Sequence, residues 1–387
     1  MERDDASRPT AGPPTGGPDP ASEATVIAAA AAAKPPETVS TTAIGGALQG
    51  TMLGPYRLEQ FVGGGGMGAV FRAHDTTLDR VVAVKVLSRA QSADDEMLRR
   101  FRNEAQSAAR LDHENIGRVH AVGSDRGWHY IVFEYIEGRN LRDLVRDEGP
   151  FAVGRAMDVV AQVADALEHA SARDVVHRDI KPSNIVITPA GRARLVDMGL
   201  ARLAPTAGDA DLTVSGMTLG TFDYISPEQA RDPRAADVRS DLYSLGCTLF
   251  YMLAGRAPFA EGTMVQKLLQ HQQDPPPDIT AIRPDVPVRL AAILARLMAK
   301  DPHDRYQRPA VLMADLAACA EENGIELSFP ARGVPPVAVE QRPAASRLSW
   351  LLPVVGLLLI VAALWFKAAA DRRPIAAPVP PAADGAG

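Results

Sequence analysis

The octapeptide HRDIKPSN, residues 177–184, carries more information about this chain than any other segment. It places a carboxylate (Asp179), an ammonium group (Lys181) and a carboxamide (Asn184) within one short stretch. Such a carboxylate can face a hydroxyl nucleophile, the amide oxygen can turn towards a metal ion, and the lysine can stabilise negative charge on a transferred group. Because eight residues can match a pattern by chance, the interpretation depends on the rest of the chain.

Length and composition allow two core-forming units, or one large domain with appendages. The chain has 387 residues and a formal net charge of −6, and its basic residues are scattered, so no nucleic-acid partner is predicted. Cys247 and Cys319 lie in apolar helical contexts without metal-ligand spacing. We therefore expect buried free thiols, which fits a reducing cytosol.

Composition divides the chain into a patterned region and its flanks. Residues 1–50 are rich in Ala, Pro, Gly, Ser and Thr, with almost no large apolar side chains, and are predicted to be disordered. Residues 56–325 hold nearly all the patterned sequence, and a Pro- and Arg-containing linker covers residues 330–347.

Residues 348–366, LSWLLPVVGLLLIVAALWF, contain no charged side chain and are predicted to form a transmembrane helix. Aromatic residues near both ends of the segment suit the membrane interfaces. A buried core helix is disfavoured, because we expect residues 367–387 to be only a short extracytoplasmic tail. Basic residues flank both ends of the segment equally, so the charge pattern does not set its orientation.

A glycine-rich segment opens the patterned region at residues 58–71, LEQFVGGGGMGAVF. Glycines allow the backbone to approach an anion closely and to direct its N–H groups towards it. A dinucleotide-binding turn would need a helix immediately afterwards. Here the alternating residues 69–73 continue as a strand, which favours a hairpin covering phosphate groups.

Lys85 lies inside the apolar strand pattern VVAVKVL, residues 81–87, where an unpaired ammonium group would be costly. Residues 94–111 show the periodicity of an amphipathic helix. Glu104, beside the apolar stripe of that helix, is the expected partner of Lys85. Glu96 is the alternative, nearer the start of the helix.

The motifs of this chain, in this order, resemble those of Hanks-type (eukaryotic-like) serine/threonine protein kinases, particularly bacterial membrane-anchored members. The flap sequence GGMG at residues 65–68 and the sequence SPEQ at residues 226–229 are typical of the bacterial branch. The octapeptide at residues 177–184 corresponds to the catalytic loop of this family, and Lys181 in that loop favours serine and threonine over tyrosine as acceptors. The resemblance implies an α+β, bilobal protein kinase fold, with a β-rich N-lobe at residues 56–136 and a helical C-lobe at residues 137–325.

The resemblance also implies MgATP in the cleft, with Mn²⁺ as an alternative metal. Asp179 would position or deprotonate the acceptor hydroxyl, and Asn184 and Asp197 would hold the metal. Lys85, paired with Glu104, would contact the phosphates. The ATP-binding positions implied are Val62, Gly63, Gly64, Gly65, Gly66, Met67, Gly68, Ala69, Val70, Ala83, Lys85, Glu134 and Ile136.

Regulatory and structural positions follow from the same resemblance. Thr213, Ser215 and Thr218 are candidate phosphosites in the loop at residues 200–220, and Arg178 would receive the phosphate. Thr221 would position the substrate and Asp179. Of the remaining residues, Asp241 would brace the catalytic loop, and Arg305 would pair with Glu228.

We therefore predict a serine/threonine kinase that transfers the γ-phosphoryl group of ATP to protein hydroxyls in bacterial signal transduction. Autophosphorylation on the activation loop, in trans within a homodimer, is expected. ATP use requires the kinase domain to face the cytosol from the inner membrane. A membrane-tethered pseudokinase scaffold is the alternative, supported by Met198, where the family has Phe.

Overall fold

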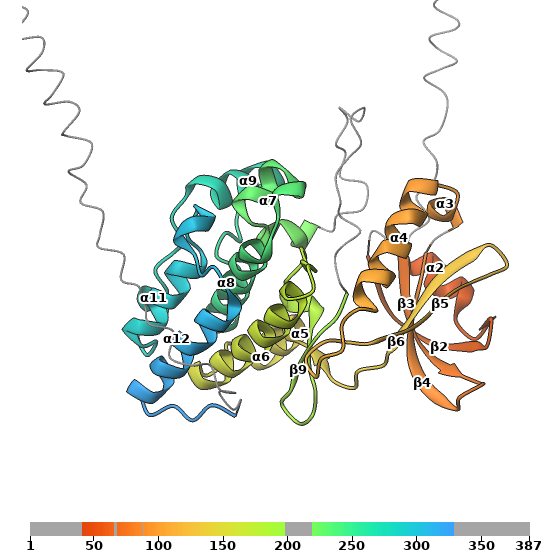
Figure 1. The fold of residues 1–387 in the computed structure, drawn as a ribbon, viewed down its shortest axis with the longest axis horizontal. Helices are drawn as coiled ribbons and strands as arrows, with labels where there is room; N and C mark the ends of the chain where they lie inside the picture. The colour runs from red at the N-terminus through yellow and green to blue at the C-terminus, as the bar shows by residue number, and fades with distance from the viewer. Residues whose placement is uncertain (1–40, 66–67, 88, 198–218, 329–387) are drawn as a thin grey trace, which may run out of the picture. The chain divides into compact units, whose positions relative to one another are not determined.

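The computed structural model describes residues 41–65, 68–87, 89–197 and 219–328, which lie in one compact unit, Met1–Val334 (Figure 1). A second unit, Pro335–Gly387, falls outside the described residues, as does the predicted span at 348–366. Within the described ranges, every helix is too short or too polar to cross a membrane.

A six-stranded antiparallel sheet forms the N-lobe, in the order β1-β2-β3-β4-β6-β5. Its strands are β1 (Met52–Leu53), β2 (Tyr56–Gly65), β3 (Gly68–Asp75), β4 (Arg80–Val86), β5 (Val119–Asp125) and β6 (Trp128–Glu134). Alternate residues of β3 and β4, such as Phe71, Val82 and Val84, are fully buried in one apolar cluster. The period-two pattern of the sequence therefore decides which side of each strand faces this cluster.

Helices α3 (Arg89–Ser92) and α4 (Asp95–Ala108) follow β4. Phe101 and Ala105 of α4 pack with Leu87 and Ile131 in a separate small cluster. The apolar stripe predicted for residues 94–111 is the stripe that the helix buries. This packing sets the distance between α4 and the strand that carries Lys85.

The expectation that residues 1–50 are entirely disordered is wrong for its last ten residues. Thr41–Leu48 form helix α2, which packs on β2 and β3. Ile44 and Leu48 are buried in the N-lobe cluster. Composition missed the helix because it has only two large apolar residues, and both are used for docking.

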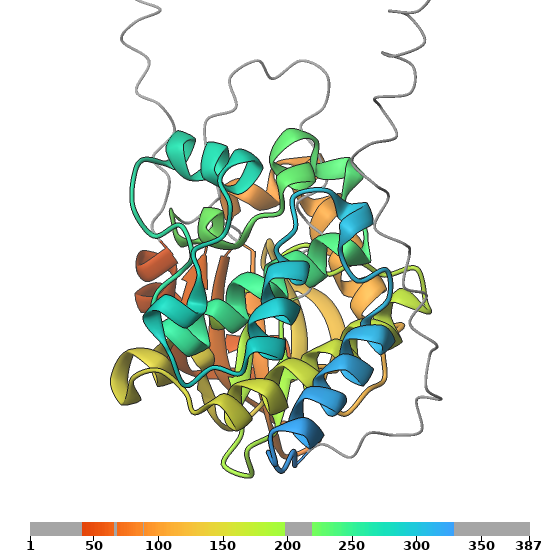
Figure 2. The same cartoon turned by 90° about the vertical axis from the view of Figure 1, so that its left-hand side faces the viewer.

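The C-lobe is helical (Figure 2), and α6 packs against both α8 and α12. Its helices are α5 (Leu141–Glu148), α6 (Val153–Ser171), α7 (Pro227–Arg231), α8 (Val238–Ala254), α9 (Met264–Gln273), α10 (Ile279–Ile282), α11 (Val288–Leu297) and α12 (Pro309–Glu322). α8 is buried nearly all round, as its sequence DLYSLGCTLFYML at 241–253 predicts. Both cysteines are free and buried, which confirms that prediction.

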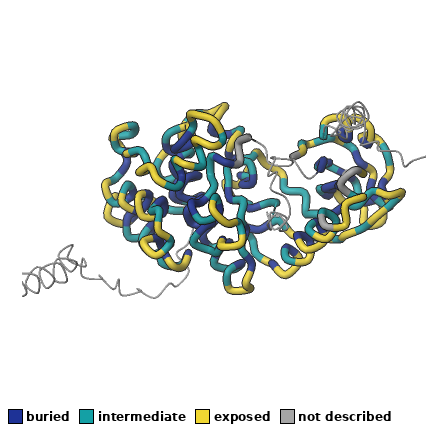
Figure 3. Tube along the Cα trace, turned by 90° about the horizontal axis from the view of Figure 1, so that it is seen from above, coloured by how far each residue is buried: buried dark blue, intermediate teal, exposed yellow. Residues whose placement is uncertain are grey.

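A small three-stranded sheet, β7 (Arg139–Asn140), β8 (Ile185–Ile187) and β9 (Ala193–Leu195), lies beside these helices. Burial alternates along the chain in both lobes, and the buried segments form their interiors (Figure 3). Because β8 follows Asn184 and β9 precedes Asp197, this sheet positions the predicted metal ligands.

Candidate active site

The octapeptide forms a loop in which its three predicted catalytic groups meet. Asn184 Nδ2 donates to the backbone oxygen of Asp179 at 2.9 Å and to its Oδ2 at 3.0 Å. Lys181 Nζ lies 2.9 Å from the same Oδ2. The short 3-10 helix η1 (Pro182–Asn184) turns the chain so that residues five apart can touch. The loop thus fixes the Asp179 carboxylate from two sides.

Asp241, in the first turn of α8, holds the start of this loop from behind. Its Oδ2 accepts from the backbone N–H of His177 at 2.8 Å, and its Oδ1 from that of Arg178 at 2.7 Å. Burial raises the pKa of Asp241 to about 7, although the two N–H donors and Arg178 oppose that rise. The predicted contact between Asp241 and the catalytic loop is present.

Lys85 joins the two lobes through two carboxylates. Its Nζ lies 2.8 Å from Glu104 Oε1 and 2.7 Å from Asp197 Oδ1. Burial alone would lower the pKa of Lys85, but Asp197 and then Glu104 outweigh it and raise that pKa. Burial raises the pKa of Glu104, against the attraction of Lys85. The partner on α4 is therefore Glu104 rather than Glu96.

Asp197 and Asn184 are brought together by strand pairing. Ile185 pairs with Leu195 across β8 and β9. The backbone N–H of Val196 donates to the backbone oxygen of Asn184 at 2.9 Å. Asp197 has a left-handed backbone, with φ of 57°. Burial alone would raise the pKa of Asp197, but the positive charge of Lys85 outweighs burial and lowers that pKa. This carboxylate is therefore ionised at neutral pH.

The oxygen-bearing pair Asn184 and Asp197 fits a magnesium ion, which takes few protein ligands and completes its shell with phosphate and water oxygens. No group of three metal-ligating side chains (His, Cys, Asp or Glu) occurs among the residues that the structure describes. Two protein ligands leave most of a magnesium coordination shell open, so the pair suits a metal that arrives with a nucleotide.

The glycine-rich segment forms the hairpin between β2 and β3, as predicted, and Gly65 pairs with Gly68 at its end. This geometry excludes the strand-turn-helix of a dinucleotide-binding turn. Gly68 has φ of 140°, and a Cβ there would lie 2.0 Å from the Val86 oxygen. Only glycine fits at this position. Val62 is exposed, while Ala69 is buried and Val70 pairs with Lys85; Gly66 and Met67 lie outside the described residues.

Of the predicted ATP-binding positions, Ala83 of β4 pairs with Phe133, and Glu134 ends β6. The Glu134 carboxylate lies 2.5 Å from Arg194 Nη2 of β9, and Arg194 also donates to the Ile116 oxygen at 3.1 Å. This ion pair links the segment between the lobes to the strand that leads to Asp197. Sequence reasoning missed Arg194, because nothing in its local pattern marks a partner sixty positions away.

Residues 226–229, which follow the loop that carries the candidate phosphosites, pack against the catalytic loop. Ser226 caps α7 in a capping box with Gln229, whose Nε2 donates to the Arg178 oxygen at 3.1 Å. Glu228 and Arg305 form the predicted pair, with bonds of 2.7 Å and 2.8 Å. The contact of Gln229 with the loop was not predicted, although SPEQ was singled out in the sequence. Thr221 lies in the 3-10 helix η3 (Leu219–Tyr224).

Several predicted positions lie outside the described residues: Met198, Thr213, Ser215 and Thr218. Arg178, the predicted phosphate receiver, has a partly buried side chain. Its Nε is buried without a hydrogen-bond partner among the described residues, and burial lowers the pKa of its guanidinium group.

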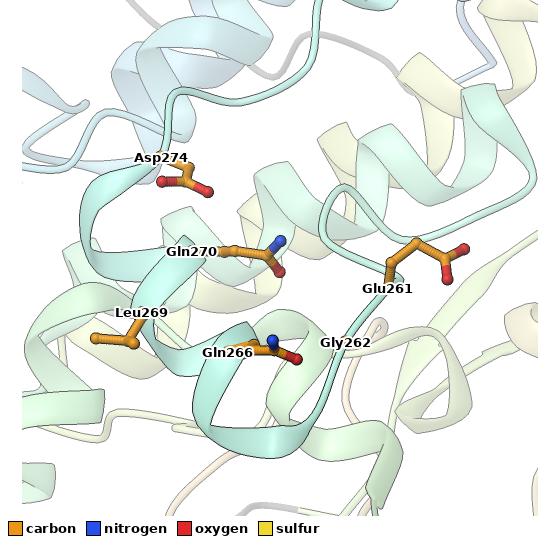
Figure 4. A pocket seen from close by; sticks show the side chains of 6 residues that line it. All are labelled: Glu261, Gly262, Gln266, Leu269, Gln270 and Asp274. Carbon is orange, nitrogen blue, oxygen red and sulfur yellow. The ribbon is translucent and has the colours of Figure 1, made fainter.

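A shallow hollow on α9 is lined by none of the predicted site residues (Figure 4). Its lining comes from Glu261, Gly262, Gln266, Leu269, Gln270 and Asp274. These residues carry none of the chemistry assembled around Asp179, so the hollow is not the candidate active site.

Comparison with known proteins agrees with this geometry. The family model described as "Protein kinase domain" matches residues 56–316. The chain is 39% identical over 263 residues to serine/threonine-protein kinase PrkC of Bacillus subtilis, covering 68% of this chain and 40% of PrkC. It is 37% identical over 305 residues to serine/threonine-protein kinase PknB of Mycobacterium tuberculosis, covering 78% of this chain and 47% of PknB. The chain thus spans less than half the length of these curated relatives.

Solved structures show the same fold. The kinase domain of PknI from Mycobacterium tuberculosis superposes with a TM-score of 0.56 and 30% sequence identity. The superposition covers 70% of this chain and 98% of that domain. The similarity therefore includes both lobes.

Proposed function

The chain belongs to the protein kinase family, and on that premise we propose that it transfers the γ-phosphoryl group of ATP to serine and threonine hydroxyls of proteins in bacterial signalling. The observation that carries the proposal is the meeting of Lys85, Glu104 and Asp197 across the two lobes, beside the cluster of Asp179, Lys181 and Asn184. A scaffold would need neither of these two sets of contacts.

Asp179 is placed to orient the acceptor hydroxyl and to receive its proton, because Asn184 and Lys181 hold its carboxylate. Lys181 adds a positive charge at the point where negative charge develops on the transferred group. Bound magnesium, held by Asn184 and Asp197, would neutralise phosphate charge and orient the nucleotide. Lys85, fixed by Glu104, offers its ammonium group to the phosphates.

The catalytic contribution of this chain is thus mainly positioning and electrostatics. His177 supports it from the interior. Its Nδ1 accepts from the N–H of Asp179 at 3.2 Å, while its Nε2 lies 3.4 Å from the Val196 oxygen. Burial lowers the pKa of His177 to about 4, so the ring is neutral and can accept at one nitrogen while donating at the other.

The deciding experiment is phosphotransfer from radiolabelled ATP by the purified full chain, with Asp179→Ala as the inactive control. We expect incorporation into the chain by the wild type and a loss of at least about a thousandfold in the variant. Absence of label in the wild type across Mg²⁺ and Mn²⁺ would favour the pseudokinase scaffold. Equal label in Asp179→Ala would contradict the role of Asp179.

Regulation is proposed to follow from phosphorylation of Thr213, Ser215 or Thr218, with Arg178 as the receiver. The Nε of Arg178 has no hydrogen-bond partner among the residues that the structure describes, which supports this because a phosphate oxygen could accept from it. Mixing active chain with a size-tagged Asp179→Ala chain tests transfer in trans. Label on the inactive chain, mapped to these three positions by mass spectrometry, is the expected result.

Membrane anchoring is proposed for residues 348–366, with the kinase domain on the cytosolic side of the inner membrane. The proposal rests on the uncharged, apolar composition of the segment and on the cytosolic supply of ATP. Membrane fractionation with protease protection tests it. Release by carbonate wash, or protection of the kinase domain in inside-out vesicles, would contradict it.

A further inference from the structure

Helix α2 runs antiparallel to β2 and contacts it along most of its length. Thr41 lies against Gly64, Gly45 lies against Phe61, and the residues just after the helix hydrogen-bond to Leu58. The Gly50 N–H donates to the Leu58 oxygen at 2.7 Å, and the Leu58 N–H donates to the Thr51 oxygen at 2.9 Å. β2 is the strand that carries the glycine-rich hairpin.

The contact at Gly45 is very close. A Cβ on Gly45 would lie 2.8 Å from two ring carbons of Phe61, which is shorter than a carbon–carbon contact tolerates. Phe61 in turn packs edge-on to Phe71 of β3, with ring centroids 5.7 Å apart. Ile44, beside Gly45, is 3% exposed. The helix therefore docks through a glycine and two buried aliphatic side chains, Ile44 and Leu48.

A second contact lies on the hairpin itself. A Cβ on Gly64 would meet Thr41 Cβ at 2.7 Å and the Gly68 oxygen at 2.9 Å, so the first turn of α2 touches the hairpin backbone. Gln49 Oε1 also accepts from the N–H of Phe61 at 3.4 Å. The strand register shifts between Phe61 and Gly63, next to these contacts.

The hairpin has little packing of its own, since a run of glycines offers no side chains and loses much conformational entropy on ordering. We infer that α2 is a positioning element for the phosphate-binding hairpin: docked on Phe61 and Gly64, it sets the height of the hairpin above the nucleotide phosphates. The inference rests on the proposed function, because it assumes that the hairpin covers ATP. A displaced α2 weakens nucleotide binding without altering the groups around Asp179.

Two neighbouring glycines of α2 provide a matched test. Alanine raises helix propensity by about 1 kcal/mol over glycine at either position. Gly46 is exposed, and a Cβ there would have nothing within 4 Å, whereas a Cβ on Gly45 strikes Phe61. Gly45→Ala and Gly46→Ala therefore differ only in whether the helix can stay docked.

The measurements are the dissociation constant of a fluorescent ATP analogue, and KM for ATP and kcat, all on the full chain. We expect Gly45→Ala to weaken analogue binding and raise KM about three- to tenfold, with kcat within about twofold. Gly46→Ala should bind at least as tightly as the wild type. In a Phe61→Ala background, Gly45→Ala should have no further effect, because the ring atoms are gone.

Equal nucleotide affinity in Gly45→Ala and Gly46→Ala would overturn the inference. If Gly45→Ala does not fold, Ile44→Ala, which loosens docking without a clash, carries the same expectation. An Ile44→Ala chain that binds the analogue like the wild type would equally overturn it. Analogue binding without phosphotransfer would count against the proposed function alone, and the affinity comparison would still decide the role of α2.

Discussion

Asp241 Oδ1 accepts a 2.7 Å hydrogen bond from the backbone N–H of Arg178, a residue held in a left-handed conformation with φ of 65°. A non-glycine residue in that region costs about 1–2 kcal/mol. This strained residue lies immediately before Asp179, and the buried carboxylate of Asp241 in α8 holds it in place. The geometry of the loop around Asp179 thus depends on Asp241, a residue outside the group of Asp179, Lys181 and Asn184.

Asp241→Asn should lower kcat by about ten- to a hundredfold, because the amide NH₂ would face one of the two N–H donors and let the loop relax. KM for ATP should change less than about threefold, since Lys85 and Glu104 do not contact Asp241. Steady-state kinetics measure both. Asp237→Asn, at the N-cap of the same helix, is the control and should be near wild type.

Glu104→Gln should raise KM for ATP about tenfold and lower kcat, because the neutral amide cannot hold the Lys85 ammonium as firmly. Lys85 would then keep only its ion pair with Asp197, at 2.7 Å. ATP titration of initial rates gives the result. Glu96→Gln tests the alternative partner; a larger effect there than at position 104 would contradict the pairing in the structure.

Arg305→Met should reduce the free energy of unfolding by about 3–5 kcal/mol, because it leaves the partly buried Glu228 without its bidentate partner. Arg305 itself is 1% exposed. Adding Glu228→Met should recover part of the loss. Urea denaturation measures these changes.

Arg289 supplies the comparison for Arg305, because it pairs with Asp315 at 2.7 Å with 37% of its side chain exposed. Exposed pairs contribute about 1 kcal/mol or less. Arg289→Met should therefore cost far less than Arg305→Met. Equal losses would show that burial does not determine the strength of these pairs.

Stability should fall between pH 7.5 and pH 5 through His177. Its pKa is about 4 in the folded chain against 6.5 for the free group, so the unfolded chain binds the proton first as pH drops below 6.5. This difference in proton binding lowers the free energy of unfolding by about 2 kcal/mol at pH 5. Urea denaturation of the wild type and of His177→Phe at the two pH values measures it.

His177→Phe should be less stable at neutral pH but should show a smaller loss on acidification. Burial also lowers the pKa of His271, to about 3, and its contribution is present in both chains. The difference between the two chains therefore isolates His177. An identical pH dependence would mean that the ring of His177 is not buried as neutral imidazole.

Sequence reasoning succeeded where local patterns carry the information. The strand around Lys85, the amphipathic helix with Glu104, the apolar helix after Asp241 and the glycine hairpin are all present as predicted. Each depends on periodicity or backbone freedom over fewer than twenty residues. The type of each element follows from its own side chains, whereas its ends do not: the helix predicted for residues 94–111 spans Asp95–Ala108.

Prediction failed for helix α2 and for the Arg194–Glu134 pair. α2 looks like part of a disordered leader, because its sequence TTAIGGAL buries only Ile44, Gly45 and Leu48. Its stability comes from a site on β2 that the helix cannot reveal by itself. Arg194 likewise gains its role from the packing of two separate sheets, which brings β9 to the end of β6.

The contiguous sequence is enough to bring Asp179, Lys181 and Asn184 into contact, because all three lie on one loop of eight residues. What holds those groups in place depends on the tertiary structure. Lys85 reaches Asp197 across 112 positions, and Asp241 reaches Arg178 across 63. Such contacts depend on how whole elements pack against one another, and local periodicity specifies the buried face of an element but not its neighbour.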